Sequence, residues 1–513
     1  MNTRDEIITA IDIGTTKIVA LAGKMDSSGR IKILGIGTTS SQGVKRGMVS
    51  NIELTAVAIK AAVEEAERIA DCKFENVFVG IAGQHIKSFQ TSMHRYIRED
   101  LGEITQKDVD ELGKDIERVP LEPGCEIIHV IPQSYTVDNE SGIKKPAGMA
   151  GRKLKGNYHI VQGHTTAVTN IKRCVNRAGF NVYNTILEPL ASAEAVLTEE
   201  EKEAGVALVD IGGGTTDIAV YYDGIIRHTA VIPFGGNMVT EDIKKGCGLL
   251  ARSAEALKIQ HGSALSEAEK DNTYVSIDGI NGREPKEISL KMLASIIEAR
   301  MAEIIGAIVF ELNNSGYSKE LAAGVVITGG GSLLKNLVQL MKYYIAMDVR
   351  LGYPTKISYG VLNEVNDAKY STSVGLLMKG YECLKTGNLM ERQIDVSVET
   401  EVGNNEPDFS VFENGNFSTL GFNQANPPVD LPIEKNTEPV TPELTVKQEV
   451  KSDVLVEKPV EKPVEKHEER VEKLEENHSK EVKKKSGLFS GFVNFTKSFT
   501  TDIFKEVNDH PLK

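Results

Sequence analysis

The sequence of 513 residues contains no tryptophan and only five cysteines. The cysteines are odd in number and widely spaced, without CxxC pairs, which argues against a zinc site or a disulfide framework and favours a reducing compartment. No apolar run reaches about 18 residues, so the sequence predicts no membrane-spanning helix. The first residues, Met1–Glu6, lead directly into a predicted strand, and we therefore expect no signal peptide.

Basic residues are fewer than acidic residues. Lysine and arginine total 59 against 73 acidic residues, which gives a formal net charge of −14. This balance argues against nucleic acid as a partner, because nucleic-acid-binding surfaces are usually basic. The chain is too long for a single hydrophobic core, and its hydrophobic content of 40% supports a large folded part, so two lobes are expected.

The most informative stretch, residues 210–217, is called the second turn below. Four apolar residues precede Asp210, three glycines follow, and the chain becomes apolar again after Asp217, which predicts strand, tight turn and strand. Glycines let backbone N–H groups approach an anion, threonine hydroxyls add donors, and aspartates at the ends of the turn can hold a metal through water. A plain hairpin is the alternative, and a Walker loop is excluded because no Gly-Lys-Ser/Thr follows. The expected phosphate-binding residues here are Gly212, Gly213, Gly214, Thr215 and Thr216.

A similar device, residues 12–17, occurs roughly 200 residues earlier and is called the first turn below. An apolar run closes on Asp12, and a second apolar run follows the turn, so the chain reads as a duplicated unit. Two such turns predict two lobes that grip one phosphate chain from both sides. Lys17 is expected to contact the phosphates, although a solvated strand residue is the alternative. The phosphate-binding residues expected here are Gly14, Thr15, Thr16 and Lys17.

Together the two turns resemble those of the actin/Hsp70/sugar-kinase superfamily. Three further stretches are similar to its other motifs: Leu187–Ala195 to the first connecting helix, Val325–Ser332 to the adenosine motif and Ser373–Leu377 to the second connecting helix. The resemblance implies an α/β, actin-like two-lobed ATPase fold built from duplicated ribonuclease-H-like domains.

The same resemblance assigns roles to residues. It implies that ATP is the ligand, with Asp12 and Asp210 holding Mg²⁺ through water. Glu188 would orient the attacking water, with Asp210 as a second catalytic residue if ATP is hydrolysed. The alternative for Glu188 is a purely structural acidic residue at a helix N-terminus, where the helix dipole favours negative charge. The residues expected to face adenosine are Gly329, Gly330 and Gly331.

Residues from Gln84 to about Gln162 are expected to form an insertion with one or two helices and about three strands, one of them at Tyr158–Gln162. This insertion makes the resemblance more specific. Its start, Gln84–Ser88, and the basic stretch Gly43–Asn51 are similar to the FtsA family of bacterial cell-division proteins. That family implies self-assembly into filaments, other division proteins as partners and a contact with the C-terminal peptide of the tubulin homologue FtsZ. Arg300, on the predicted long helix Leu290–Leu312, is the expected contact, and an exposed helix charge is the alternative.

The composition changes past Leu389. Residues 390–486 are rich in Pro, Asn, Glu and Lys and poor in aromatics, which predicts a disordered charged linker. Residues 487–506 have helical apolar periodicity and are expected to form an amphipathic helix that lies on a membrane surface. Docking onto the protein's own lobes or onto a partner is the alternative. The expected membrane-facing residues are Leu488, Phe489, Phe492, Phe495, Phe499 and Ile503.

We therefore predict an ATP-binding cytoskeletal adaptor, at most a slow ATPase, at the cytoplasmic face of the inner membrane at the division site. A soluble kinase or a chaperone-type ATPase of the same superfamily is the alternative. The expected domains are a first lobe (1–84 and 163–200), an inserted subdomain (85–162), a second-lobe core (201–230 and 310–389), an outer subdomain (231–309), the linker and the terminal helix.

Overall fold

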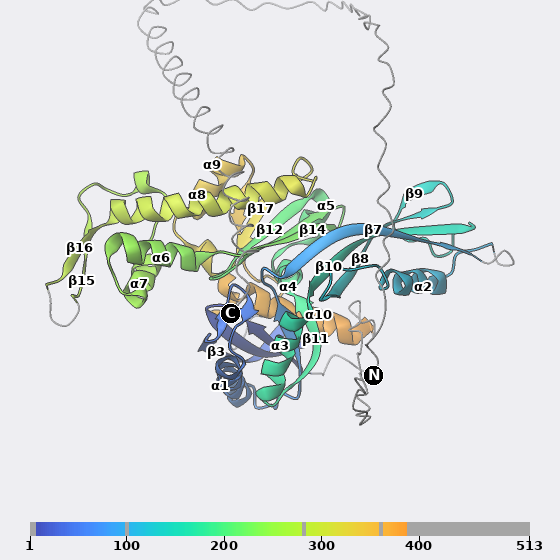
Figure 1. The fold of residues 1–513 in the computed structure, drawn as a ribbon, viewed down its shortest axis with the longest axis horizontal. Coiled ribbons are helices and arrows are strands. Elements are labelled where there is room, and N and C mark those ends of the chain that lie inside the picture. Colours follow the sequence, from blue (N-terminus) through green and yellow to red (C-terminus); the bar gives the residue numbers. More distant parts are fainter. Residues whose placement is uncertain (1–6, 98–101, 280–283, 359–362, 387–513) are drawn as a thin grey trace, which may run out of the picture. The chain divides into compact units, whose positions relative to one another are not determined.

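The computed structural model describes residues 7–97, 102–279, 284–358 and 363–386, and Figure 1 shows their arrangement. The predicted linker and terminal helix, with all six expected membrane-facing residues, lie outside the described residues. The described chain is a mixed α/β structure with one five-stranded sheet in each of two lobes and a four-stranded sheet in the insertion.

The sheet of the first lobe surrounds the first predicted hairpin. Its strand order is β11-β6-β1-β2-β3, in which β2 pairs antiparallel with both β1 and β3, and β6 pairs parallel with both β1 and β11. Every residue of β1 is buried, because helices cover the sheet. The strands are β1 (Ile8–Ile13), β2 (Lys17–Met25), β3 (Ile31–Ser40), β6 (Asn76–Ile81) and β11 (Asn181–Leu187). The helices are α1 (Ile52–Ala70), α3 (Thr165–Arg177) and α10 (Ser371–Thr386), and a small hairpin is formed by β4 (Val44–Lys45) and β5 (Met48–Val49). Helix α10 was expected in the second-lobe core, as part of residues 310–389, but it packs on β1, β2 and β6 and therefore belongs with the first lobe.

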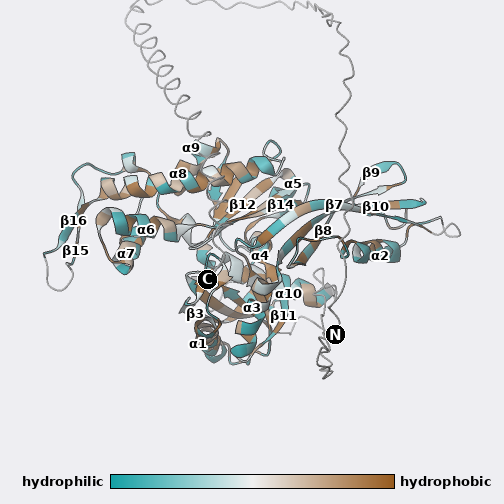
Figure 2. Cartoon of the chain, in the orientation of Figure 1, coloured by the Kyte–Doolittle hydropathy of each residue, from teal (hydrophilic) through white to brown (hydrophobic). Residues whose placement is uncertain are grey.

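The sheet of the second lobe repeats this topology. Its order is β14-β13-β12-β17-β18, with antiparallel pairs on the β13 side of β12 and parallel pairs on the β17 side. The duplication predicted from the two turns is therefore a duplication of whole sheets. The strands are β12 (Val206–Ile211), β13 (Thr216–Tyr222), β14 (Ile225–Ile232), β17 (Val325–Thr328) and β18 (Val349–Leu351), and helix α9 (Leu337–Ile345) lies between the last two in the chain. Hydrophobic residues concentrate along the strands of both lobes (Figure 2).

The outer part of the second lobe is organised around the long helix α8 (Leu290–Asn314). Apolar residues spaced about 3.6 residues apart line its inner face. Six of them are buried, namely Leu293, Ile297, Met301, Ile304, Ile305 and Ile308, and two, Ile296 and Val309, are half-buried against the same core. The helical spacing of these residues therefore predicted the packing of this helix. Its neighbours are α6 (Gly236–Cys247), α7 (Ala251–His261), β15 (Tyr274–Ile277) and β16 (Lys286–Ser289).

The insertion forms its own sheet and its own small core. The sheet order is β7-β10-β8-β9, and helix α2 begins at a capping box between Thr105 and Asp108. We expected about three strands with a short one at Tyr158–Gln162. The structure has four, and the strand at this position is longer because it pairs with a neighbour on each side. Pro132 lies at a register shift, as its missing N–H predicts. The elements are β7 (Ile86–Tyr96), α2 (Gln106–Ile116), β8 (Cys125–Val137), β9 (Glu140–Ile143) and β10 (Lys153–His164).

The insertion also contacts the edge strand of the second lobe. Ser88 Oγ donates to the carbonyl of Thr229 at 2.9 Å, and Gln133 Nε2 donates to the carbonyl of Ile226 at 2.7 Å. Buried His159 is hydrogen bonded to the Thr229 hydroxyl at 3.0 Å. Because the free edge of β14 is covered in this way, the insertion links the two lobes beside its covalent attachment to the first.

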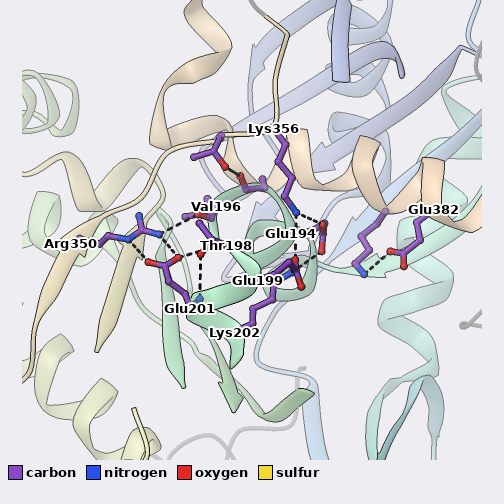
Figure 3. Close-up of polar contacts among 12 residues, drawn as sticks. Glu194, Val196, Thr198, Glu199, Glu201, Lys202, Arg350, Lys356 and Glu382 are labelled. Carbon is purple, nitrogen blue, oxygen red and sulfur yellow. Dashed lines mark hydrogen bonds and ion pairs between the residues drawn. The ribbon is translucent and has the colours of Figure 1, made fainter. Parts of the chain in front are cut away.

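The chain crosses between the lobes twice, and ion pairs join the two crossings (Figure 3). The first crossing is α4 (Glu188–Val196) followed by α5 (Glu199–Ala204). The second crossing is the segment after β18. It reaches the first lobe at Lys356, whose carbonyl accepts a hydrogen bond from the N–H of Ile31 at 2.9 Å. Glu194 accepts hydrogen bonds from Lys202 at 3.1 Å and Lys356 at 2.8 Å. Burial alone would raise the pKa of Glu194, but the two lysines outweigh it and lower that pKa to about 2.

Candidate functional site

The first and second turns touch each other. A Cβ built on Gly213 would lie 1.9 Å from the Thr16 hydroxyl oxygen, and one built on Gly214 would lie 2.4 Å from that of Thr15. Any side chain at either glycine would therefore push the two turns apart. The structure brings together the two stretches that the sequence predicted to act together.

The second turn is closed by its own backbone. The N–H of Gly212 donates to the carbonyl of Thr215 at 2.9 Å, and Asp210 and Asp217 face each other in the register of β12 and β13. The Thr216 hydroxyl donates to the carbonyl of Phe234 at 3.0 Å. These hydrogen bonds fix the backbone of the turn, and therefore the positions of Asp210 on β12 and Asp217 on β13.

Each aspartate of the site is held by hydroxyl groups. Ser373 Oγ donates to Asp12 Oδ2 at 2.8 Å. Ser192 Oγ and Thr372 Oγ1 both donate to Asp210 Oδ2, at 2.6 and 3.0 Å. All three hydrogen bonds are accepted by Oδ2 atoms, so the Oδ1 atoms of Asp12 and Asp210 accept none of them.

Asp217 is a further carboxylate of the site. Its Oδ2 accepts a hydrogen bond from the Thr215 hydroxyl at 3.0 Å. Its Oδ1 is buried and, within the described chain, has no hydrogen-bond partner. A buried carboxylate oxygen without a donor is costly unless water or a cation satisfies it.

The electrostatics of the site are dominated by four acidic groups. Burial raises the pKa values of Asp12, Asp210 and Asp217, that of Asp217 to about 8, and their mutual repulsion adds to the rise for Asp12 and Asp217. Burial, then repulsion by the three aspartates, raises the pKa of Glu188 well above its usual range. Burial, with repulsion by Lys369, outweighs the attraction of Asp12 and lowers the pKa of Lys17 to about 8. A cation placed here would relieve the repulsion among the acids.

These residues fit Mg²⁺ held through water. Among the described residues, no group of three or more His, Cys, Asp or Glu side chains is arranged to ligate a metal directly. Mg²⁺ commonly keeps several waters and contacts only one or two carboxylates, and carboxylate oxygens of Asp12, Asp210 and Asp217 are available as acceptors for such waters. The donor set is therefore suitable, and the turns supply glycine backbone for a phosphate chain.

Lys17 lies at the edge of the site. Its ammonium group donates to the carbonyl of Lys369 at 2.5 Å and lies 4.0 Å from the centre of the Tyr370 ring. It is half-buried, so it does not match the alternative of a solvated strand residue. A phosphate contact for Lys17 stays a prediction.

The adenosine motif packs against the second turn. Strand β17 ends at Thr328, and Gly329 follows with a φ of 83°, which favours glycine. A Cβ on Gly329 would lie 2.2 Å from Asp210 Oδ1, and one on Gly331 would lie 2.5 Å from the Ile211 side chain. Two of the three glycines thus have a packing role, whereas a Cβ on Gly330 would meet no atom closer than 4.0 Å. Their contact with adenosine stays a prediction.

Glu188 begins helix α4, as its acidic character at a helix N-terminus predicted. A Cβ built on Gly80 of β6 would lie 3.0 Å from Glu188 Oε1, so the side chain lies against the strand next to β11. Its carboxyl group belongs to the same buried acidic set as the aspartates. Its place at a helix N-terminus is confirmed, and its role in orienting water stays a prediction.

Arg300 lies away from this site on α8. Its Nε donates to Asp242 Oδ2 and its Nη1 to Glu303 Oε2, each at 2.5 Å. The side chain is 22% exposed, so it is neither free nor fully solvated. A partner that uses this guanidinium has to share it with, or take it from, these two carboxylates.

The sequence predictions missed the hydroxyl groups of the site. Ser192 and Ser373 lie within stretches similar to the connecting helices, and Thr372 directly precedes the second of them, but hydroxyls carry little signal in sequence. Asp217 was noted as an end of the second turn without a separate role. The signal that could have identified it is its pairing with Asp210 across a hairpin of known register.

The sequence is similar to those of known proteins over most of its length. A family model described as cell division protein FtsA matches residues 207–375, and one described as the SHS2 domain inserted in FtsA matches residues 83–162. The cell division protein FtsA of Neisseria meningitidis serogroup B is 40% identical over 404 residues, which cover 79% of this chain and 96% of that protein. The FtsA of Escherichia coli K12 is 35% identical over 401 residues, which cover 77% and 95%.

A likeness among solved structures extends to the fold. The structure titled PilM-PilN type IV pilus biogenesis complex aligns with a TM-score of 0.52 at 14% identity and covers 73% of this chain and 98% of that chain. At this identity the likeness concerns the fold alone, and it supports the actin-like two-lobed architecture that the repeated sheets display.

Proposed function

The chain belongs to the FtsA family of cell division proteins, and we propose that it is an ATP-binding adaptor that polymerises on the membrane, anchors FtsZ there and helps to assemble the division septum. The observation that carries the nucleotide part is the contact between the first and second turns, with buried carboxylates on both sides. Family membership favours this function over the soluble kinase or chaperone-type ATPase that the sequence left open.

In this proposal the two turns hold the phosphates of ATP. Backbone N–H groups of the glycines and the threonine hydroxyls donate to phosphate oxygens, and Lys17 adds a positive charge. Asp12 and Asp210 hold the waters of Mg²⁺, which neutralises phosphate charge. Gly329, Gly330 and Gly331 lie next to adenosine.

ATP held in this way contacts both lobes at once. The lobes are otherwise joined by the two crossings, by the packing of α10 on α4 and by the insertion on β14. A ligand between the turns therefore fixes one relative orientation of the lobes. We infer that this orientation is the one that self-assembles into filaments.

Turnover is expected to be slow or absent. Glu188 is the candidate to orient water, with Asp210 beside it, but burial and the three neighbouring aspartates raise its pKa and so disfavour the carboxylate form that a general base needs. A bound cation would lower that pKa. This arrangement suits an adaptor that responds to ATP occupancy more than a fast enzyme.

The partner and membrane contacts lie elsewhere on the chain. Arg300 is proposed to bind a carboxylate of the FtsZ C-terminal peptide in exchange for Asp242 or Glu303. Residues 487–506 are proposed to attach the protein to the cytoplasmic face of the inner membrane at the division site. No helix among the described residues is long and apolar enough to cross a bilayer.

Equilibrium ATP binding tests the nucleotide part. We expect the whole chain to bind ATP with Mg²⁺ and Asp210→Ala to weaken binding at least about tenfold, because a buried charged contact is lost. Asp348→Ala, which removes an exposed aspartate of the same lobe, serves as the matched control and should leave affinity unchanged. Equal affinity in the wild type and Asp210→Ala, or no binding by the wild type, would contradict the proposal.

Co-sedimentation with anionic liposomes tests the membrane part. The whole chain should pellet, whereas a chain ending at Ser486 and the Phe492→Ser/Phe499→Ser variant should stay in solution. A matched variant of the polar face, Asn494→Ser/Thr501→Ser, should pellet like the wild type. Pelleting of the truncated chain would place the membrane contact elsewhere.

A further inference from the structure

Three consecutive hydroxyl residues begin helix α10, and each contacts a different part of the site. Ser371 Oγ is hydrogen bonded to Thr328 Oγ1 at 2.7 Å, at the end of the strand that leads into the adenosine motif. Thr372 Oγ1 donates to Asp210, and Ser373 Oγ donates to Asp12. We call residues 371–373 the hydroxyl ladder.

Two of the three ladder residues lie in the protein interior: Ser371 and Ser373 are each 1% exposed, whereas Thr372 is half-buried. Buried hydroxyls are normally hydrogen bonded, so Thr328 fixes the orientation of Ser371 and Asp12 fixes that of Ser373. The reverse also holds, because Asp12 Oδ2 receives its side-chain hydrogen bond from Ser373.

The ladder reaches both lobes from one rigid element. Asp12 lies on β1 of the first lobe, and Asp210 lies on β12 of the second. Neighbouring residues of one helix therefore hold the carboxylates of both turns. A third hydroxyl, Ser192 of α4, lies 3.0 Å from Thr372 Oγ1 and bonds the same Asp210 oxygen.

We propose that Thr372 and Ser373 are positioning residues for the Mg²⁺ of the nucleotide site. By donating to Oδ2 of Asp210 and of Asp12, they fix the two carboxylate groups, whose Oδ1 atoms would then accept hydrogen bonds from metal-bound waters. This inference rests on the proposed ATP-binding function and adds residues that do not themselves touch nucleotide or metal.

A purely structural role for these hydroxyls predicts a different result. If they only hold α10 in place, their removal weakens binding of free ATP and of Mg²⁺-ATP by the same factor. If they orient the aspartates, their removal weakens binding only when Mg²⁺ is present. The ratio of the two affinities therefore separates the two roles.

The experiment compares ATP affinity in Mg²⁺ and in EDTA for the whole chain and its variants. Thr372→Val, which keeps the shape of the side chain, and Ser373→Ala should each weaken binding about tenfold in Mg²⁺, as expected for a lost hydrogen bond to a charged group. In EDTA both should bind like the wild type. Thr372→Ser, which keeps the hydroxyl, should retain the Mg²⁺-dependent affinity of the wild type.

Thr55→Val is the matched control. Thr55 is also a fully buried helix hydroxyl, bonded to the carbonyl of Asn51 at 2.7 Å, but it lies on α1 away from the site. We expect a lower melting temperature for this variant and an unchanged Mg²⁺-to-EDTA affinity ratio. Melting curves of all variants show whether each one folds.

The outcomes separate this inference from the function on which it rests. A wild-type chain that binds no ATP, or binds it equally with and without Mg²⁺, overturns the nucleotide or metal part of the proposed function and the inference with it. A wild-type chain with Mg²⁺-dependent binding, and ladder variants that lose affinity equally in Mg²⁺ and EDTA or not at all, overturns the inference alone. A Thr372→Ser variant that loses affinity in Mg²⁺ as Thr372→Val does also overturns the inference.

Discussion

Gly375 of α10 lies against the backbone carbonyl of Ala191 on α4: a Cβ built on Gly375 would be 1.8 Å from that oxygen. These two helices carry the hydroxyls that bond Asp210, so their close approach sets the geometry of the site. Ala191 and its neighbours on α4 are buried, which leaves no direction in which the backbone can yield easily.

Gly375→Ala should therefore destabilise the protein. We expect a loss of about 1–3 kcal/mol in the free energy of unfolding, as for overpacked interiors, together with weaker ATP binding. Gly113→Ala is the matched control, because Gly113 also lies within a helix, α2, but a Cβ there meets no atom within 4 Å. That variant should gain about 0.5–1 kcal/mol. Equal effects of the two substitutions in chemical denaturation would contradict the packing argument.

The pH dependence of ATP binding depends on Lys17. Its pKa is lowered to about 8, and the cationic form exists below that value. ATP affinity should therefore fall as pH rises through about 8, or somewhat higher once bound phosphate stabilises the cation. Lys17→Arg keeps its charge in this range, so its ATP affinity should fall less than that of the wild type between pH 7 and pH 9.5. A fall that remains in this variant would come from Asp217, whose pKa is also about 8. A similar fall in both proteins, measured by calorimetry, would exclude Lys17 as the titrating group.

Glu188 should matter for turnover and not for binding. Glu188→Gln keeps the shape of the side chain and removes its ability to accept a proton. We expect ATP affinity within about twofold of the wild type, and any ATP hydrolysis reduced at least about a hundredfold, as for loss of a general base. Unchanged hydrolysis in a phosphate-release assay would remove Glu188 from the catalytic role.

Arg300 should govern binding of the FtsZ peptide. Arg300→Ala should weaken peptide binding about tenfold, because a charge-assisted contact is lost. Asp242→Asn weakens the competing internal ion pair and should strengthen binding about threefold. Lys342→Ala, which removes an exposed cation on α9, is the control and should have no effect. Fluorescence anisotropy with a labelled peptide measures all three, and an Arg300→Ala protein with wild-type affinity would rule the contact out.

Local pattern predicted most elements of this fold. The apolar runs around Asp12 and Asp210 predicted both central hairpins, and the periodicity of residues 290–312 predicted the long helix of the outer subdomain. The length of strand β10 was underestimated, because residues 153–157 are polar or small except for Leu154, and they form a strand through pairing with β7 and β8. Non-local pairing of this kind leaves little trace in the strand itself.

The site could be predicted only in part. The turns and their aspartates follow from sequence because glycine, threonine and aspartate have recognisable roles within a few residues. The bond between Ser373 and Asp12 joins residues 361 positions apart, and the ion pairs of Arg300 with Asp242 depend on how two helices pack. Such contacts are consequences of the fold, so they become visible only in the structure.

The proposed adaptor function requires the chain to carry FtsZ to a membrane in an ATP-dependent way. Co-sedimentation of FtsZ with anionic liposomes, with and without the whole chain and with and without ATP, tests this function. We expect FtsZ to pellet only when both the chain and ATP are present, and we expect the Asp210→Ala chain not to support pelleting. Equal pelleting of FtsZ without ATP, or with the Asp210→Ala chain, would refute the proposed function.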